Sequence, residues 1–161
     1  PASRPAVGLE TLLSDYFNMP VTLSQFEGRW LTLRPDDRSA LRPELGAAPG
    51  YCQLGVDAVA GDRVWDVQSA FRLKLGPLSY QAFVDFMPNG PQMRKLAELT
   101  RLYGGAEKTF DVELTLKKDE VPFCRLQDDG AEAPRLGWNT WLRQHAALAD
   151  RSDAIFVPEE A

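Results

Sequence analysis

The clearest alternation of hydrophobic and polar positions runs from Val67 to Leu75. Side chains on one face would be Val67, Ser69, Phe71, Leu73 and Leu75, and those on the other would be Gln68, Ala70, Arg72 and Lys74. A period of two is typical of a strand with one face on a core and the other in water. We predict a long strand over about 63–75 that ends at a turn, because Gly76 frees the backbone and Pro77 cannot donate to a ladder.

A second alternation predicts another long strand over about 108–117. Its core face would carry Phe110, Val112, Leu114 and Leu116, and its wet face Asp111, Glu113, Thr115 and Lys117. Shorter patterns predict strand pieces near 21–25 and 30–33, joined by a bulge or bend at Gly28. Further strands are expected at Val121–Leu126, as an edge strand interrupted by Pro122, at Arg135–Arg143 and at Ala154–Val157.

Apolar residues recur at helical spacing in three places, which predicts helices over about 7–17, 79–87 and 91–103. Ser79 is suited to cap the second helix, and the third begins at Pro91 and ends at Gly104-Gly105. Pro35 could begin one more short helix through Leu41. The stretch 43–61 is rich in glycine and proline, so we predict a long loop with a functional or mobile role.

This order of elements predicts an α+β fold with a mostly antiparallel sheet, short helices and long loops. Residues 1–6 are expected to be a leader or linker, and residues 7–161 a single domain. The sequence does not begin with methionine, so we expect a fragment or a processed product.

The charge of the chain argues against a nucleic-acid partner. The 161 residues contain 18 lysines and arginines against 23 aspartates and glutamates, which gives a net charge of −5. Phosphate neutralisation supplies most nucleic-acid affinity, and the basic residues here are scattered. No apolar run reaches the roughly 18 residues that a membrane helix needs. Cys52 and Cys124 show no metal-ligand spacing and are compatible with a reducing compartment.

No pattern of residues indicates catalysis, a cofactor or a metal. His145 is the single histidine, and nothing near it supplies an activated nucleophile. The paired acidic residues fall in predicted turns or at the terminus: Asp36-Asp37, Asp119-Glu120, Asp128-Asp129 and Glu159-Glu160. A hydrolase would need two of them to converge across a cleft, so this class stays open as an alternative. No glycine-rich phosphate-binding motif is present.

Four tryptophans fall in or beside predicted strands: Trp30, Trp65, Trp138 and Trp141. Core packing is the usual role of tryptophan, because the ring buries a large area. In the segment LGWNTWL, strand alternation would place Trp141 on the face opposite Trp138. Trp141 would then be covered by a helix or act as an anchor for another protein. A small-ligand or carbohydrate-binding domain that uses sheet tryptophans is a further alternative.

Four segments of the chain resemble the TssG family, also called ImpH or VasB, of type VI secretion baseplates. They are LLSDYFNMPVTLSQFEGRWLTL at Leu12–Leu33, LGVDAVAGDRVWDVQSAFRLKLGPLSYQAFVDFMP at Leu54–Pro88, FDVELTLKKDEVPFCRL at Phe110–Leu126 and LGWNTWL at Leu136–Leu142. The motifs GRW, LG-x-D-A-V-x-G-x-R-V-W-D, LGPL and LGW-x-T-W-L are specific in combination. Ala60 and Val67 depart from the family's usual leucine and arginine, and the family's N-terminal half has no counterpart here.

The resemblance implies a structural assembly protein without enzymatic activity. A TssG-like protein would join TssF and TssE in a baseplate wedge around the VgrG spike complex and would also engage TssK. It would be cytoplasmic in a bacterium, in a baseplate docked to the inner-membrane complex. No cofactor, nucleic acid or membrane insertion is implied.

Five residues are predicted partner contacts on this basis. Tyr51 lies in the 43–61 loop, Trp141 lies on the two-faced tryptophan segment, and Gln68, Arg72 and Lys74 form the wet face of the long strand. We expect the loop or Trp141 to contact TssF or TssK, since assembly interfaces use aromatic anchors.

Overall fold

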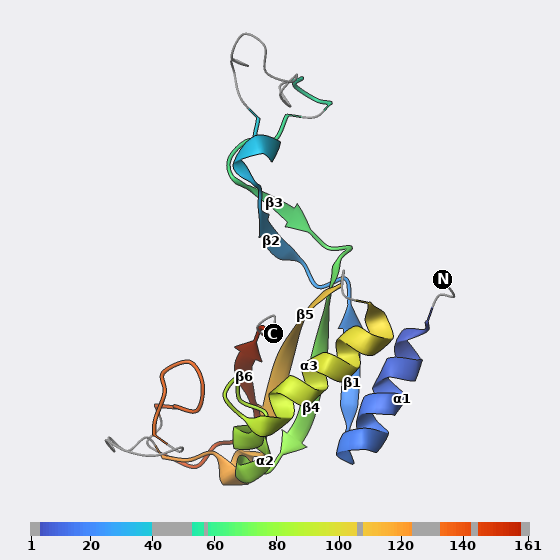
Figure 1. Ribbon diagram of the computed structural model, residues 1–161. Helices are drawn as coiled ribbons and strands as arrows, with labels where there is room; N and C mark the ends of the chain where they lie inside the picture. Colours follow the sequence, from blue (N-terminus) through green and yellow to red (C-terminus); the bar gives the residue numbers. More distant parts are fainter. Residues whose placement is uncertain are drawn as a thin grey trace. The chain divides into compact units, whose positions relative to one another are not determined.

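The computed structural model describes residues 4–39, 53–56, 58–105, 108–123, 133–142 and 145–158 (Figure 1). They divide into two compact units. The sheet unit comprises Pro1–Gln25 and Phe71–Ala161, and the ribbon unit comprises Phe26–Ala70. The predicted single domain from residue 7 onward stays a prediction.

The sheet unit is built on four strands in the order β1-β4-β5-β6. These strands are β1 (Val21–Gln25), β4 (Ala70–Leu78), β5 (Thr109–Leu116) and β6 (Arg151–Phe156). The pairs β1–β4 and β5–β6 are antiparallel. Residue numbers increase in the same direction along β4 and β5. Phe71 stacks on Phe110, Arg72 bonds Asp111, and the Lys117 N–H donates to the Leu78 carbonyl. These two central strands are therefore parallel, as their arrows in Figure 1 show.

Three helices pack on one face of this sheet: α1 (Ala6–Phe17), α2 (Tyr80–Asp85) and α3 (Pro91–Gly104) (Figure 1). A parallel strand pair needs a crossover connection, and α2 and α3 supply it between β4 and β5. The Ser79 side chain accepts a hydrogen bond from the Ala82 N–H and so caps α2, as predicted. Pro91 occupies the first turn of α3, where its missing N–H has no helical partner to lose.

The core lies between the helices and the face of the sheet that they cover. Alternate residues of β5 are buried at 5% exposure or less, as the sequence pattern predicts: Phe110, Val112, Leu114 and Leu116. Leu73 and Leu75 of β4 join them from the next strand. The helices contribute Leu13, Phe83 and Leu96, each with no exposed surface. These contacts confirm the α+β fold.

The ribbon unit contains two antiparallel strands, β2 (Arg29–Thr32) and β3 (Arg63–Asp66), and the 3-10 turn η1 (Pro35–Asp37). Trp30 lies opposite Trp65 in the ladder. Of the bulge or bend expected at Gly28, the structure has a bend at Phe26, with φ of 61°, and β1 and β2 belong to different sheets. Of the predicted 43–61 loop, the structure describes residues 53–56 and 58–61.

The prediction of one strand over 63–75 is wrong, because the chain bends between β3 and β4. The Asp66 carboxylate accepts hydrogen bonds from the backbone N–H groups of Gln68 and Ser69 and from the Ser69 hydroxyl. This side-chain-closed turn replaces ladder hydrogen bonds at 67–69. The strand also continues past the expected stop, since β4 runs through the cis Gly76–Pro77 peptide to Leu78.

Two further strand predictions fail. Residues 136–139 form a turn, in which the Trp138 and Asn139 N–H groups donate to the Arg135 carbonyl. The Asn139 side chain closes it by accepting from the Arg135 N–H at 2.7 Å. Val121–Phe123 is not a strand either; it follows the 3-10 turn η2 (Lys118–Glu120), and 124–126 lie outside the described residues. The C-terminal strand is confirmed as β6 and is longer than predicted.

Candidate partner-binding surfaces

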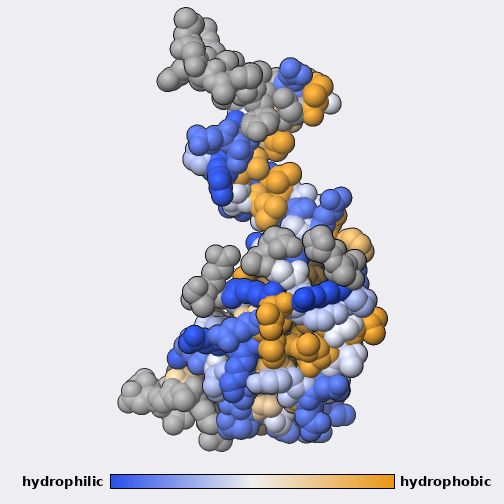
Figure 2. All heavy atoms as spheres, turned by 45° about the vertical axis from the view of Figure 1, so that its right-hand side comes forward, coloured by the Kyte–Doolittle hydropathy of each residue, from blue (hydrophilic) through white to orange (hydrophobic). Residues whose placement is uncertain are grey.

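The ribbon unit exposes a pair of tryptophans. Trp30 is 60% exposed and Trp65 is 53% exposed, although their rings meet edge to face at 5.2 Å. They lie on neighbouring strands because their backbones are directly opposite in the β2–β3 ladder. Phe26 adds a further exposed ring in this unit, and Figure 2 shows hydrophobic side chains on its surface. We call Trp30 and Trp65 the tryptophan pair.

Gly28 fixes the position of one ring of this pair. A Cβ at Gly28 would lie 2.0 Å from a ring carbon of Trp65, so the indole rests directly on the glycine backbone. No larger residue leaves room for that ring position. The sequence pattern predicts that both tryptophans lie in or beside strands, but it favours core packing as their role. One signal could have revealed that these tryptophans are exposed. Trp30 and Trp65 lie directly opposite each other on two strands that are too short to build a core.

Two of the predicted contact residues, Arg72 and Lys74, lie on the polar face of the sheet unit. The Arg72 guanidinium donates to both Asp111 carboxylate oxygens, at 2.7 and 2.8 Å. Arg72 and Lys74 also approach Glu113, at 3.7 and 4.0 Å. Arg72 is only 22% exposed, so this arginine is engaged within the chain, whereas Lys74 is 43% exposed. A bidentate pair of this kind fixes geometry between two strands.

The other predicted contacts are scattered. Gln68 is exposed in the turn after β3 and so does not continue the face of Arg72 and Lys74 along one strand. Tyr51 lies outside the described residues. Asp66, which closes the turn, has a pKa below its ordinary value because the Ser69 hydroxyl and the Gln68 and Ser69 N–H groups stabilise the carboxylate.

Trp141 and Trp138 both pack against the core of the sheet unit, which corrects the expectation of opposite faces. Trp141 meets Phe83 edge to face at 5.7 Å, and Trp138 meets Phe156 in the same way at 5.7 Å. The turn closed by Asn139 explains the result, because it removes the strand alternation that separated them. Core packing therefore accounts for the partial burial of Trp141, and its use as an anchor stays a prediction.

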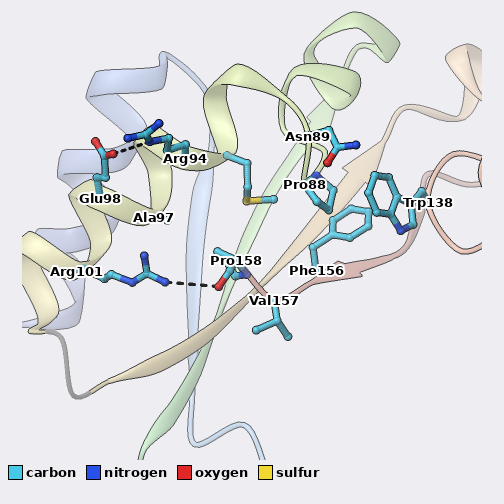
Figure 3. A pocket seen from close by; sticks show the side chains of 11 residues that line it. Pro88, Asn89, Arg94, Ala97, Glu98, Arg101, Trp138, Phe156, Val157 and Pro158 are labelled. Atoms are coloured by element: carbon cyan, nitrogen blue, oxygen red, sulfur yellow. Dashed lines mark hydrogen bonds and ion pairs between the residues drawn. The ribbon is translucent and has the colours of Figure 1, made fainter. Parts of the chain in front are cut away.

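A groove of about 370 Å³ opens between α3 and the end of β6 (Figure 3). Its apolar wall includes Met93, Trp138 and Phe156. Figure 3 shows Arg94 paired with Glu98 and Arg101 reaching the Pro158 carbonyl. A second recess of about 260 Å³ is lined by residues 136–138 and 140–142 together with Asp153 and Ala154. We call these two hollows the α3 groove and the turn recess.

The described residues offer little for acid–base or metal chemistry. Within them, no group of three histidine, cysteine or acidic residues is arranged to hold a metal ion. His145 is exposed, and so are the acidic pairs Asp36-Asp37 and Asp119-Glu120, which argues against a hydrolase that uses them. The pairs Asp128-Asp129 and Glu159-Glu160 lie outside the described residues. None of the described helices is long and apolar enough to cross a membrane.

Comparisons with known proteins identify the family. The family model described as "Type VI secretion, TssG" matches residues 1–143. No protein with a curated description is significantly similar. A solved TssK-TssF-TssG baseplate subcomplex contains a similar chain, with TM-score 0.69 and 21% identity over 99% of this chain and 65% of that one. A second solved type VI secretion baseplate complex gives TM-score 0.57 and 22% identity over 98% and 43%.

This chain thus spans less than two thirds of the first solved chain, and the two structural likenesses show a shared fold. The family match covers most of the sequence and agrees with the motif series from Leu12 to Leu142. TssG is a structural component of the type VI secretion baseplate and not an enzyme. The chain belongs to the TssG family of type VI secretion.

Proposed function

We propose that this chain builds the type VI secretion baseplate by binding TssF and TssK, and that the tryptophan pair of the ribbon unit is one contact. The observation that carries the proposal is the exposure of two neighbouring indoles in a protein of an assembly family. Exposed aromatic clusters mark interaction sites, and tryptophan is enriched among residues that dominate binding energy.

The energetics of the ribbon unit support the same view. A two-stranded ribbon is marginally stable by itself in water. Trp30 and Trp65 leave more than half of their area exposed, so much of the hydrophobic stabilisation that they could provide is not realised within the chain itself. A partner that covers them would gain that stabilisation and order the ribbon at once.

The solved complex with a similar chain contains TssK and TssF, which supplies the two candidate partners. In the wider proposal, TssE and the VgrG spike complex complete the wedge, and the protein works on the cytoplasmic side at the inner-membrane complex. Tyr51 and the rest of the 43–61 stretch would extend the same contact, because they belong to the ribbon unit.

The test is co-purification of the full-length protein with TssF and with TssK, each measured separately. The double variant Trp30→Ala/Trp65→Ala should weaken one of the two interactions by about 100-fold or more, as expected for hot-spot tryptophans. The matched control is Tyr16→Ala/Leu102→Ala, which removes two exposed side chains of the sheet unit and should leave both interactions unchanged. Wild-type binding to both partners by a folded Trp30→Ala/Trp65→Ala variant would refute the contact.

A further inference from the structure

The face of the β2–β3 ribbon that carries the tryptophan pair also carries exposed polar side chains. Thr32 lies opposite Arg63 in the ladder, two residues along from the pairing of Trp30 with Trp65. Directly opposite residues share a face of an antiparallel pair, and so do alternate residues of one strand. The burial pattern agrees, because these four residues are exposed and the strand residues between them are only partly exposed.

Arg34 continues this face beyond the ladder. The Leu33 N–H donates to the Asp62 carbonyl at 2.8 Å, so the two chains stay paired for one residue past Thr32. Arg34 itself has an extended backbone, with φ of −61° and ψ of 151°, and it is exposed. Alternation then places it on the same side as Thr32. We call the following set the tryptophan–arginine face: Trp30, Trp65, Arg34 and Arg63.

The arginines of the two ribbon faces differ in their access to carboxylates. Arg29, on the other face, lies opposite Asp66 in the ladder, whereas Arg63 lies opposite an uncharged residue. Arg63 approaches Asp62 at 3.9 Å, but both side chains are more than half exposed, and such a pair contributes little. Among the described residues, the Arg34 guanidinium has no hydrogen bond or ion pair. The tryptophan–arginine face thus has two cationic groups that are available to bind carboxylates.

The tryptophan pair adds apolar area and unused donors to these charges. The two rings meet edge to face at 5.2 Å, and neither indole N–H donates a hydrogen bond to the part of the chain that the structure describes. A bound segment can therefore place a large apolar side chain on the rings and a carbonyl against an indole N–H. An arginine guanidinium binds a carboxylate through two parallel hydrogen bonds. The face favours a segment that combines an apolar residue with carboxylates.

The spacing along the ribbon defines where those carboxylates would lie. Arg63 is two residues along from the tryptophan pair, and Arg34 is four residues from Trp30. At about 3.3 Å per residue of extended chain, these separations are roughly 7 and 13 Å. An extended partner segment has the same rise, so its acidic residues would come two and four positions from its apolar residue.

We propose that the tryptophan–arginine face binds an extended acidic segment of a partner protein. A large apolar residue of the segment would cover the tryptophan pair, and carboxylates two and four positions away would pair with Arg63 and Arg34. This inference rests on the proposed function, in which the tryptophan pair is a partner contact. A protein is favoured over nucleic acid or an anionic membrane, because the net charge of −5 opposes binding to a phosphate-rich surface.

The first test measures binding of the full-length protein to TssF and to TssK separately, at low and at high salt. Arg34→Glu/Arg63→Glu should weaken by about 10-fold or more the same interaction that Trp30→Ala/Trp65→Ala weakens, because the new charges repel the carboxylates. Binding by the unaltered protein should fall as salt rises. The matched control is Lys95→Glu/Lys118→Glu, which reverses two charges at exposed sites of the sheet unit and should bind normally.

The variants separate this inference from the proposed function. Loss of binding in the tryptophan variant, with normal binding by a folded arginine variant, would overturn the acidic segment and leave the tryptophan contact standing. Equal weakening by the lysine control would show a general effect of charge and would also overturn the acidic segment. Normal binding by the tryptophan variant would refute both proposals.

The second test identifies the segment. Arg63→Lys keeps the positive charge and supplies an amine, so a zero-length carbodiimide should join it to a partner carboxylate in the complex. Mass spectrometry should place that carboxylate two positions from a large apolar residue. A variant that binds normally but gives no such cross-link, or one at a carboxylate without that neighbour, would contradict the proposal.

Other occupants are tested with the protein alone. Sedimentation reports a second copy, and binding to phosphatidylglycerol vesicles or to single-stranded DNA reports a membrane or nucleic acid. None of these should bind at physiological salt. Binding to any of them that Arg34→Glu/Arg63→Glu abolishes would assign the face to that occupant and overturn the proposal.

Discussion

The sheet unit contains a core of fully buried apolar side chains, whereas the ribbon unit leaves its two tryptophans more than half exposed. In the sheet unit, Phe83 and Leu114 have no exposed surface and pack between helices and sheet. In the ribbon unit, Trp30 and Trp65 remain more than half exposed on two short strands. The first arrangement stabilises the chain itself, whereas the second leaves hydrophobic area for a partner. Burial, rather than residue type, separates a folding role from a binding role.

The strongest test of this difference is to truncate one large apolar side chain in each unit. Leu114→Ala should lower the free energy of unfolding of the sheet unit by about 2–5 kcal/mol, because it leaves a cavity in the centre of the core. Trp30→Ala should change the same quantity by less than about 0.5 kcal/mol. Denaturant unfolding followed by far-UV circular dichroism measures both. Similar losses from the two variants would erase the distinction.

The polar face of the sheet unit provides the next contrast. Arg72→Leu leaves the Asp111 and Glu113 carboxylates without their guanidinium partner, so it should destabilise the sheet unit by about 1–3 kcal/mol. Lys74→Leu, at a more exposed and longer contact, should cost less than about 1 kcal/mol. The same unfolding measurement ranks the two. A larger loss from Lys74→Leu would show that Arg72 does not organise this face.

The β1 edge of the sheet, where the Leu23 N–H donates to the Glu10 carboxylate of α1, should respond more weakly. Glu10→Ala removes the acceptor of the Leu23 N–H and should cost about 1 kcal/mol of stability. Glu10→Gln keeps an amide oxygen in reach and serves as the control. Hydrogen exchange at Leu23 should accelerate in the alanine variant and stay slow in the glutamine variant. Unchanged exchange in both would mean that α1 does not protect β1 through this bond.

A change confined to the ribbon unit should leave the sheet unit untouched. Gly28→Ala would place a methyl group 2.0 Å from a ring carbon of Trp65, so the indole must move off the backbone. Near-ultraviolet circular dichroism should report the loss of the Trp30–Trp65 arrangement, while the unfolding midpoint of the sheet unit stays the same. Gly104→Ala, where a Cβ meets nothing within 4 Å, is the control.

The smallest expected effect is the loss of the Asp66 turn at low pH. The pKa of Asp66 is lowered by the Ser69 hydroxyl and nearby N–H groups, so the folded turn favours the ionised carboxylate. Its contribution is present above the ordinary aspartate pKa of 3.8 and is lost as the pH falls through the lowered value. Exchange of the Gln68 and Ser69 amides, corrected for intrinsic pH dependence, should rise below that pH. Asp66→Ala should show the faster exchange at every pH.

Features with a strong local signal could be read from the sequence. The alternation of β5 predicted its buried residues Phe110 to Leu116, and proline and glycine marked the bounds of α3. Local patterns suffice there because the same residues set both the backbone geometry and the buried face. The family, too, followed from motifs that the TssG match supports.

Two of the failed strand predictions share a physical cause, which is that side-chain hydrogen bonds redirect the backbone without changing hydrophobic periodicity. Asp66 bends the chain within an unbroken alternation, and Asn139 turns a segment that reads as a strand. Parallel pairing of β4 with β5 is likewise a long-range property that neither strand encodes alone. The exposure of the tryptophan pair was missed because its cause is the absence of covering layers around two short strands.

The pairing of Gln25 with Phe71 has a consequence for how this fold can vary. These residues flank the ribbon unit in sequence and face each other as the last rung of the β1–β4 ladder. The intervening chain is therefore an insertion between two hydrogen-bonded neighbours, and the cost of closing such an insertion grows slowly with its length. Related proteins can lengthen, shorten or exchange it while keeping the same core. The partner-binding surface of the inserted ribbon can therefore change in evolution without a change in the residues that fold the sheet unit.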